Sequence, residues 1–128
     1  MKRYPHLPDS EFAIMQIIWS QASPISKTQV AALAEPHKGW KPQTVYTLLN
    51  RLTEKGFLST EKKGKERFYT FLVAQEDYLN QETDRFMKTV HKNSLTGLMN
   101  ALFANNQFSK EDLSELEQWL KKKSKGRF

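Results

Sequence analysis

Apolar residues recur at helical spacing along the N-terminal part of the chain. A first stripe opens near Asp9 and predicts a mostly buried helix. Its apolar members are Phe12, Ile14, Met15, Ile17, Ile18 and Trp19. Ser26 and Gln29 have the spacing of a capping box, in which the two side chains satisfy free backbone donors of a helix start. The pattern therefore predicts a second, short helix that ends near Glu35 and Pro36.

A third helix is predicted from Pro42, because the missing N–H of proline costs nothing in a first turn. One side of this helix is apolar, and Gly56 provides its C-terminal stop. The apolar side consists of Val45, Leu48, Leu49 and Leu52. Residues 57–73 then alternate as two strands do, and Gly64 between lysines marks the turn of a hairpin. This order is typical of a winged helix-turn-helix.

From Ala74 onward the chain consists of helix-forming residues without a strand signal. Three amphipathic helices are predicted there, and the last starts at Ser109 with Asp112 in a capping position. Short helices draw most of their stability from packing against something else, so we expect this region to be an oligomerisation arm. The expected fold is mainly α with a small β-hairpin: a winged-helix DNA-binding domain over residues 1–73 and a helical dimerisation region over residues 74–128.

Basic charge is concentrated in the first of these regions. The chain of 128 residues carries 20 Lys and Arg against 14 Asp and Glu, a net charge of +6. Residues 1–73 hold 11 basic and 6 acidic residues, a surplus of five, whereas residues 74–128 hold 9 and 8, a surplus of one. A basic surface favours polyanionic partners, so the surplus points to nucleic acid as the partner of the N-terminal region.

The chain lacks the residues that several classes of function require. With no cysteine, disulfides, thiolate metal sites and a cysteine nucleophile are excluded. His6, His37 and His91 lie far apart in the chain, so we expect no metal site. Neither a glycine-rich phosphate loop nor a nucleophile motif is present, and we expect no enzyme and no cofactor. Since no apolar stretch is long enough to span a bilayer, we expect a cytoplasmic protein without membrane insertion.

The polar side of the third helix is the candidate DNA-reading surface. Recognition helices meet base edges mainly through residues near their N-terminal end. The residues predicted to read bases are Gln43, Thr44, Tyr46 and Thr47. Glutamine pairs with adenine through two hydrogen bonds, while threonine and tyrosine contact a thymine methyl group or donate to a base or phosphate. The alternative is an ordinary solvated helix face.

A second set of residues is predicted to contact DNA phosphates. These residues are Lys41, Asn50, Arg51, Lys62, Lys63, Lys65 and Arg67. Phosphate contacts orient a protein on DNA and weaken steeply with salt, but they carry no sequence information. The alternative for the lysines is a solubilising hairpin tip, since lysine also protects strand edges.

Four segments together carry a resemblance that covers nearly the whole chain: EFAIMQIIW, KPQTVYTLLNRLTEKGFL, the wing ending in RFYTF, and FSKEDLSELE in the tail. In this combination the chain resembles the penicillinase and methicillin-resistance repressor family (BlaI/MecI/CopY type). The resemblance implies a transcriptional repressor that binds a pseudo-palindromic double-stranded DNA operator as a homodimer with interlocked C-terminal helices. The residues expected at the dimer contact are Leu95, Leu98, Met99, Leu102, Leu113, Leu116 and Leu120.

Two departures from the family pattern concern the inducing signal. The resemblance implies proteolytic cleavage at an Asn-Phe bond in β-lactam-responsive members, and aligning FSKEDLSELE places that bond at Ala101-Leu102. Copper-responsive members carry a cysteine-rich C-terminus, which this chain lacks. The signal therefore stays open between an upstream protease of different preference and an unknown inducer.

Two other functions also stay open at the level of sequence. A winged helix sometimes contacts a protein through its third helix and wing, and a basic domain sometimes binds DNA or RNA without sequence preference. The operator sequence and the regulated genes are not encoded in any of these patterns.

Overall fold

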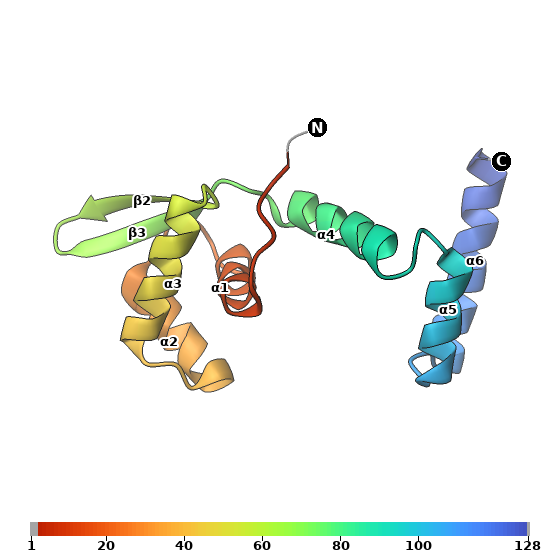
Figure 1. The fold of residues 1–128 in the computed structure, drawn as a ribbon. Helices are drawn as coiled ribbons and strands as arrows, with labels where there is room; N and C mark the ends of the chain where they lie inside the picture. The colour runs from red at the N-terminus through yellow and green to blue at the C-terminus, as the bar shows by residue number, and fades with distance from the viewer. Residues whose placement is uncertain (1–2, 128) are drawn as a thin grey trace. The chain divides into compact units, whose positions relative to one another are not determined.

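The structure, a computed structural model, describes residues 3–127 and divides the chain into two compact units, Met1–Glu82 and Thr83–Phe128 (Figure 1). Its elements in chain order are α1 (Asp9–Trp19), β1 (Ile25–Ser26), α2 (Lys27–Lys38), α3 (Pro42–Glu54), β2 (Leu58–Lys63), β3 (Glu66–Phe71), α4 (Gln75–Thr89), α5 (Leu95–Ala104) and α6 (Lys110–Arg127). The predicted fold class, mainly helical with a small sheet, is confirmed.

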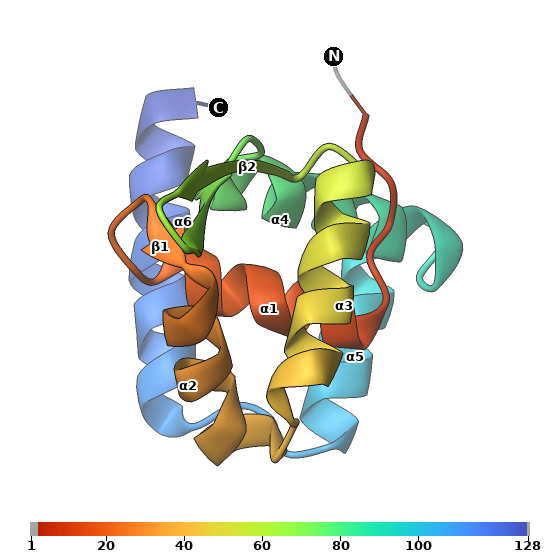
Figure 2. The same cartoon turned by 90° about the vertical axis from the view of Figure 1, so that its left-hand side faces the viewer.

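The apolar core of the first unit lies among α1, α2 and α3, which are grouped together in Figure 2. The predicted apolar side of α3 supplies four of its buried side chains, namely Val45, Leu48, Leu49 and Leu52. Tyr69 from the hairpin and Tyr78 from α4 close the core with rings that are almost fully buried. Burial of one side of α3 fixes the polar side toward solvent.

The sheet has three strands in the order β1-β3-β2, one more than predicted. The expected hairpin is present, with Leu58 opposite Phe71, Lys63 opposite Glu66, and Gly64 in the turn at φ +65°. β1 has only two residues, so it carries no alternation that a sequence pattern can reveal. It exists because residues Ile25 and Ser26 pair with β3 once the helices pack.

The second helix is longer than predicted. The expected end near Glu35 and Pro36 is wrong, because α2 continues through Pro36 to Lys38. Proline removes one hydrogen bond from a helix interior, and near a C-terminus few turns are left to disturb. The helix ends instead at Gly39, which adopts the left-handed conformation at φ +65° and donates its N–H to the Glu35 carbonyl at 2.8 Å.

The second unit contains the end of α4 together with α5 and α6. The predicted cap of the last helix is present, since the Ser109 N–H donates to the Asp112 carboxylate and the Asp112 N–H donates to the Ser109 hydroxyl, both at 3.0 Å. From Thr83 to Gly126, the span over which burial is described, no side chain is buried. No helix within residues 3–127 has the length and apolarity to cross a membrane.

The two compact units meet within α4, after Glu82. Residues 75–82 of α4 belong to the first unit, and the Tyr78 ring, only 2% exposed, lies in that unit's core. The division into a DNA-binding domain over residues 1–73 and a dimerisation region over residues 74–128 concerns function, and it stays a prediction.

A buried ion pair joins α1 to the end of α3. The Glu11 side chain is only 3% exposed, and its Oε1 lies 2.5 Å from Nζ of Lys55, the residue that caps the C-terminus of α3. A buried carboxylate is tolerated when a cation and hydrogen bonds replace its water. The pair therefore ties α3 to α1 at the end opposite the predicted base readers.

Replacing Lys55 with alanine should lower the free energy of unfolding by about 2 kcal/mol, since the Glu11 carboxylate would stay buried without its cation. This is less than the roughly 3–5 kcal/mol expected for a fully buried pair, because the Lys55 side chain is 32% exposed. Urea unfolding measures the change. The double variant Glu11→Leu/Lys55→Met should recover most of the lost free energy of unfolding, because apolar residues can often take the place of a buried ion pair without loss of stability. A Lys55→Ala midpoint equal to that of the wild type would contradict this account.

Candidate nucleic-acid interface

The exposed side of α3 carries the residues predicted to read bases. Gln43, Thr44 and Thr47 are exposed, whereas Tyr46 is half-buried. All four lie in the N-terminal half of the helix, which starts at Pro42. Their backbone is held in place because the opposite side of the same helix is packed in the core. The structure therefore brings the four predicted readers together on one rigid element.

The hydroxyl of Thr47 is already used within the helix. Its Oγ1 donates to the Gln43 carbonyl at 3.1 Å. With the hydroxyl proton occupied, Thr47 offers a methyl group and an acceptor oxygen to a base edge. A methyl group packs well against the methyl of thymine.

The Tyr46 ring contacts a lysine that was not predicted from the sequence. Lys27, the first residue of α2, places its Nζ 4.0 Å from the centre of the Tyr46 ring. Such a cation–π contact orients the ring and keeps the ammonium beside α3. No local pattern marks Lys27, because its position next to Tyr46 arises only when α2 packs on α3. It adds a cation to the candidate interface.

The cations of the wing divide between its two faces. Lys62 is opposite Arg67 in the strand register, so both lie on the face that also carries the buried Tyr69. Lys63 is opposite Glu66 and lies on the other face. Alternation along a strand produces this division. The helix-side face of the wing thus holds two cations and no carboxylate from β2 or β3.

Arg67 is less available than the wing lysines. Its Nη1 donates to the Thr60 hydroxyl at 3.2 Å, and the side chain is half-buried. The other residues predicted to contact phosphate are all exposed: Lys41, Asn50, Arg51, Lys62, Lys63 and Lys65. Lys41 is the N-cap of α3, and Lys65 lies in the hairpin turn.

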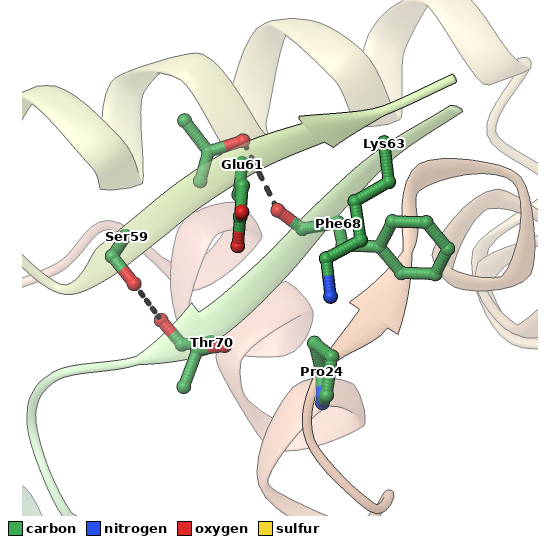
Figure 3. A pocket seen from close by; sticks show the side chains of 7 residues that line it. Pro24, Ser59, Glu61, Lys63, Phe68 and Thr70 are labelled. Atoms are coloured by element: carbon green, nitrogen blue, oxygen red, sulfur yellow. Dashed lines mark hydrogen bonds between the residues drawn. The ribbon is translucent and has the colours of Figure 1, made fainter. Parts of the chain in front are cut away.

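The outer face of the wing has mixed charge and an open hollow of about 270 Å³ (Figure 3). Lys63 and Glu61 both line the hollow, together with the ring of Phe68. Ser59 and Thr60 tie β2 to β3 by donating to the Thr70 and Phe68 carbonyls, at 3.4 and 3.1 Å respectively. Because a carboxylate accompanies the lysine, this face attracts phosphate less than the opposite one does.

Burial raises the pKa of the Tyr69 hydroxyl above its ordinary value of 10.0, although a hydrogen bond with Thr60 and the nearby Arg67 charge oppose this effect. Tyr69 is therefore uncharged at neutral pH. Its phenol does not cancel the positive charge on the helix-side face of the wing.

The tail residues expected at a dimer contact differ in exposure. Leu98, Met99, Leu102 and Leu116 are half-buried, while Leu95, Leu113 and Leu120 are exposed. Large apolar side chains outside that set are exposed as well, among them Phe103 by 52% and Trp119 by 53%. In the sequence, both residues lie at helical spacing from neighbouring leucines, and this spacing is the signal that could have added them to the predicted set. Over residues 3–127, no group of three metal-ligating side chains comes together.

The sequence matches the model of the penicillinase repressor family over residues 7–122. The chain belongs to this family. The penicillinase repressor of Bacillus licheniformis is 31% identical over 120 residues, which cover 94% of this chain and 93% of that protein. The methicillin resistance regulatory protein MecI of Staphylococcus aureus (strain N315) is 28% identical over 117 residues, which cover 91% and 94%. The family resemblance seen in the sequence is confirmed.

Solved structures of a family member support the winged helix. The DNA-binding domain of the repressor BlaI is 35% identical, with a TM-score of 0.54 over 61% of this chain and 94% of that one. The monomeric form of B. licheniformis BlaI in complex with the blaP half-operator matches with a TM-score of 0.53, 35% identity and the same coverage. The predicted winged helix-turn-helix is thereby confirmed.

Proposed function

We infer that this chain is a DNA-binding transcriptional repressor that reads an operator with α3 and the β2–β3 wing. The observation that carries this conclusion is the exposed polar side of α3, which is held on a packed core beside a cationic wing. It is supported by 35% identity, over 61% of this chain, to a repressor solved on its half-operator. Membership of the penicillinase repressor family supports a repressor, and we propose no catalytic activity for the chain. Occupying the operator blocks access to a promoter, and the cytoplasm is the proposed location.

Base reading and phosphate binding fall to different residues in this proposal. Gln43, Thr44, Tyr46 and Thr47 enter the major groove with the N-terminal half of α3. Lys41, Asn50 and Arg51 contact phosphates beside that groove, and the wing cations contact the next stretch of backbone. Lys27 joins the phosphate-binding set because its ammonium lies over the Tyr46 ring.

The repressor acts as a homodimer on a pseudo-palindromic operator. The tail has no buried side chain from Thr83 to Gly126, yet it exposes apolar residues along α5 and α6. Helices of this kind need a partner surface, and a second copy supplies an equivalent one by two-fold symmetry. Each protomer then reads one half-site, in keeping with the BlaI monomer bound to a half-operator.

Induction would act on the tail. Ala101 and Leu102, the positions aligned with the cleavage bond of β-lactam-responsive members, lie inside α5 and are half-buried. A protease must open a helix before it can cut, so cleavage there would require local unwinding of α5. An upstream protease of altered preference and an unknown inducer both remain proposals.

Alanine at Gln43 should relax sequence preference at one operator position, by about 1–3 kcal/mol of discrimination. Alanine at Lys62 or Lys65 should instead weaken binding to every duplex alike and make the slope of log K against log salt shallower by about one contact. Competition titrations with base-substituted duplexes at several salt concentrations separate the two effects.

Lys63→Ala is the matched control for Lys62→Ala. It removes the same charge from the same strand, but on the face shared with Glu61 and Glu66, so its effect should be smaller. If neither the Gln43 nor the lysine variants change duplex binding, DNA is not the ligand of this surface. If Gln43→Ala lowers the affinity for duplexes of every sequence equally, α3 does not read bases.

Aspartate at Leu98 or Leu116 should dissociate the dimer, because an unpaired charge in an apolar interface costs roughly 3–5 kcal/mol. Sedimentation velocity measures the change in mass. Ser114→Asp is the matched control, since it adds the same charge at an exposed position of α6. An unchanged dimer in both leucine variants would remove these leucines from the interface.

A further inference from the structure

The N-terminal segment holds the start of α4 on the DNA-reading unit. The Tyr4 N–H donates to Oε1 of Gln81 at 2.8 Å, and Nε2 of Gln81 donates to the Tyr4 carbonyl at 2.8 Å. One side-chain amide thus binds both polar groups of one backbone residue, as a neighbouring strand would. This pairing fixes Gln81 in position and direction at once.

Tyr78 forms a second attachment three residues earlier in the same helix. Its hydroxyl accepts a hydrogen bond from the Leu7 N–H at 2.8 Å, and the contact is buried. Its ring lies edge-on to Phe57 at 5.4 Å between centroids and also contacts Phe12 and Trp19, at 5.7 and 6.1 Å. Such aromatic contacts add stability beyond the area that they bury.

Further contacts complete the attachment. Nδ1 of His6 lies 2.6 Å from Oε1 of Glu82, and the Trp19 indole N–H donates to the Val73 carbonyl at 2.9 Å just before α4. Tyr78, Gln81 and Glu82 are spaced i, i+3 and i+4, which places them on one face of the helix. The N-terminal segment therefore lies along that face as a strap.

The attachment connects the recognition helix to the tail. Phe57, which contacts both Tyr4 and Tyr78, follows the end of α3 by three residues, and its N–H donates to the Leu52 carbonyl of α3 at 3.0 Å. On the other side, α4 continues without interruption from Gln75 to Thr89, past the end of the first unit at Glu82. The strap therefore holds the start of the helix that leads from the reading unit into the tail.

We propose that Gln81 and Tyr78, with the strap of residues 3–7, are positioning residues that set the half-site spacing accepted by the dimer. The inference rests on the proposed function, since it assumes that two copies read two half-sites. Joining two binding sites raises affinity only when the connection spans them correctly. If the start of α4 is held in place, the second reading unit of the dimer is presented at one half-site spacing. If the start of α4 is loosened, the second reading unit is spread over many half-site spacings.

The test compares Gln81→Ala with the wild type on DNA selected from a random pool by the full-length wild-type chain. Three probes are used: the selected duplex, one half-site cut from it, and duplexes with base pairs inserted between the half-sites. Gln81→Ala should bind the half-site with an affinity within about twofold of that of the wild type. It should bind the selected duplex roughly tenfold more weakly than the wild type does, which is part of the gain in affinity of about 10²–10⁴ that joining two binding sites provides. Its affinity should also vary less with spacing.

Asn80→Ala is the matched control, because Asn80 is an exposed neighbour on the same helix; it should behave as the wild type. Tyr78→Phe keeps the ring and removes the hydroxyl that accepts from the Leu7 N–H, so it should change spacing preference in the same direction even if Gln81→Ala does not fold. Sedimentation confirms that the variants remain dimers.

Two results would overturn the inference. If Gln81→Ala and Tyr78→Phe discriminate spacing as the wild type does, the strap does not set it. If half-site affinity falls as much as affinity for the whole duplex, the residues support the reading unit itself. If the wild-type chain selects no preferred duplex, the proposed function is refuted and the inference falls with it. This outcome differs from the two results above, in which the wild type does select a duplex.

Discussion

The packing of one side of α3 is the constraint on which the reading surface depends. Val45, Leu49 and Leu52 are fully buried and Leu48 nearly so, which leaves the helix no freedom to rotate. Its polar side must therefore face outward, at a fixed angle to the wing. The Glu11–Lys55 pair holds the far end of the same helix. Preorganisation of this kind lets the binding energy go into contacts with DNA rather than into ordering the protein.

The two units differ in how complete they are. The first buries a core of its own, while the tail exposes leucines and aromatic rings along α5 and α6. This division suits the proposed function, in which one reading unit recognises a half-site and two copies joined through the tail occupy the whole operator tightly. In the same proposal, a signal that opens the tail would lower operator affinity without contacting α3, so that induction and sequence recognition would use separate parts of the chain.

Local spacing explains what was predictable from the sequence. The stripe of α3, the hairpin at Gly64 and the cap at Ser109 depend on neighbours within a few residues, and all three were predicted. β1 was not, because two residues carry no period. The end of α2 was misplaced because proline near a helix end costs only one hydrogen bond. Lys27 beside Tyr46, and the strap along α4, arise from packing between distant segments and leave no local pattern.

The most direct test of two-fold DNA reading is hydroxyl-radical footprinting of the full-length chain on duplexes that it selects from random DNA. The account predicts two inverted half-sites, protected on one face of the duplex with centres about one helical turn, 10–10.5 bp, or a multiple of it apart. Selection of no common sequence, or protection that extends evenly along the DNA as protein is added, would contradict it.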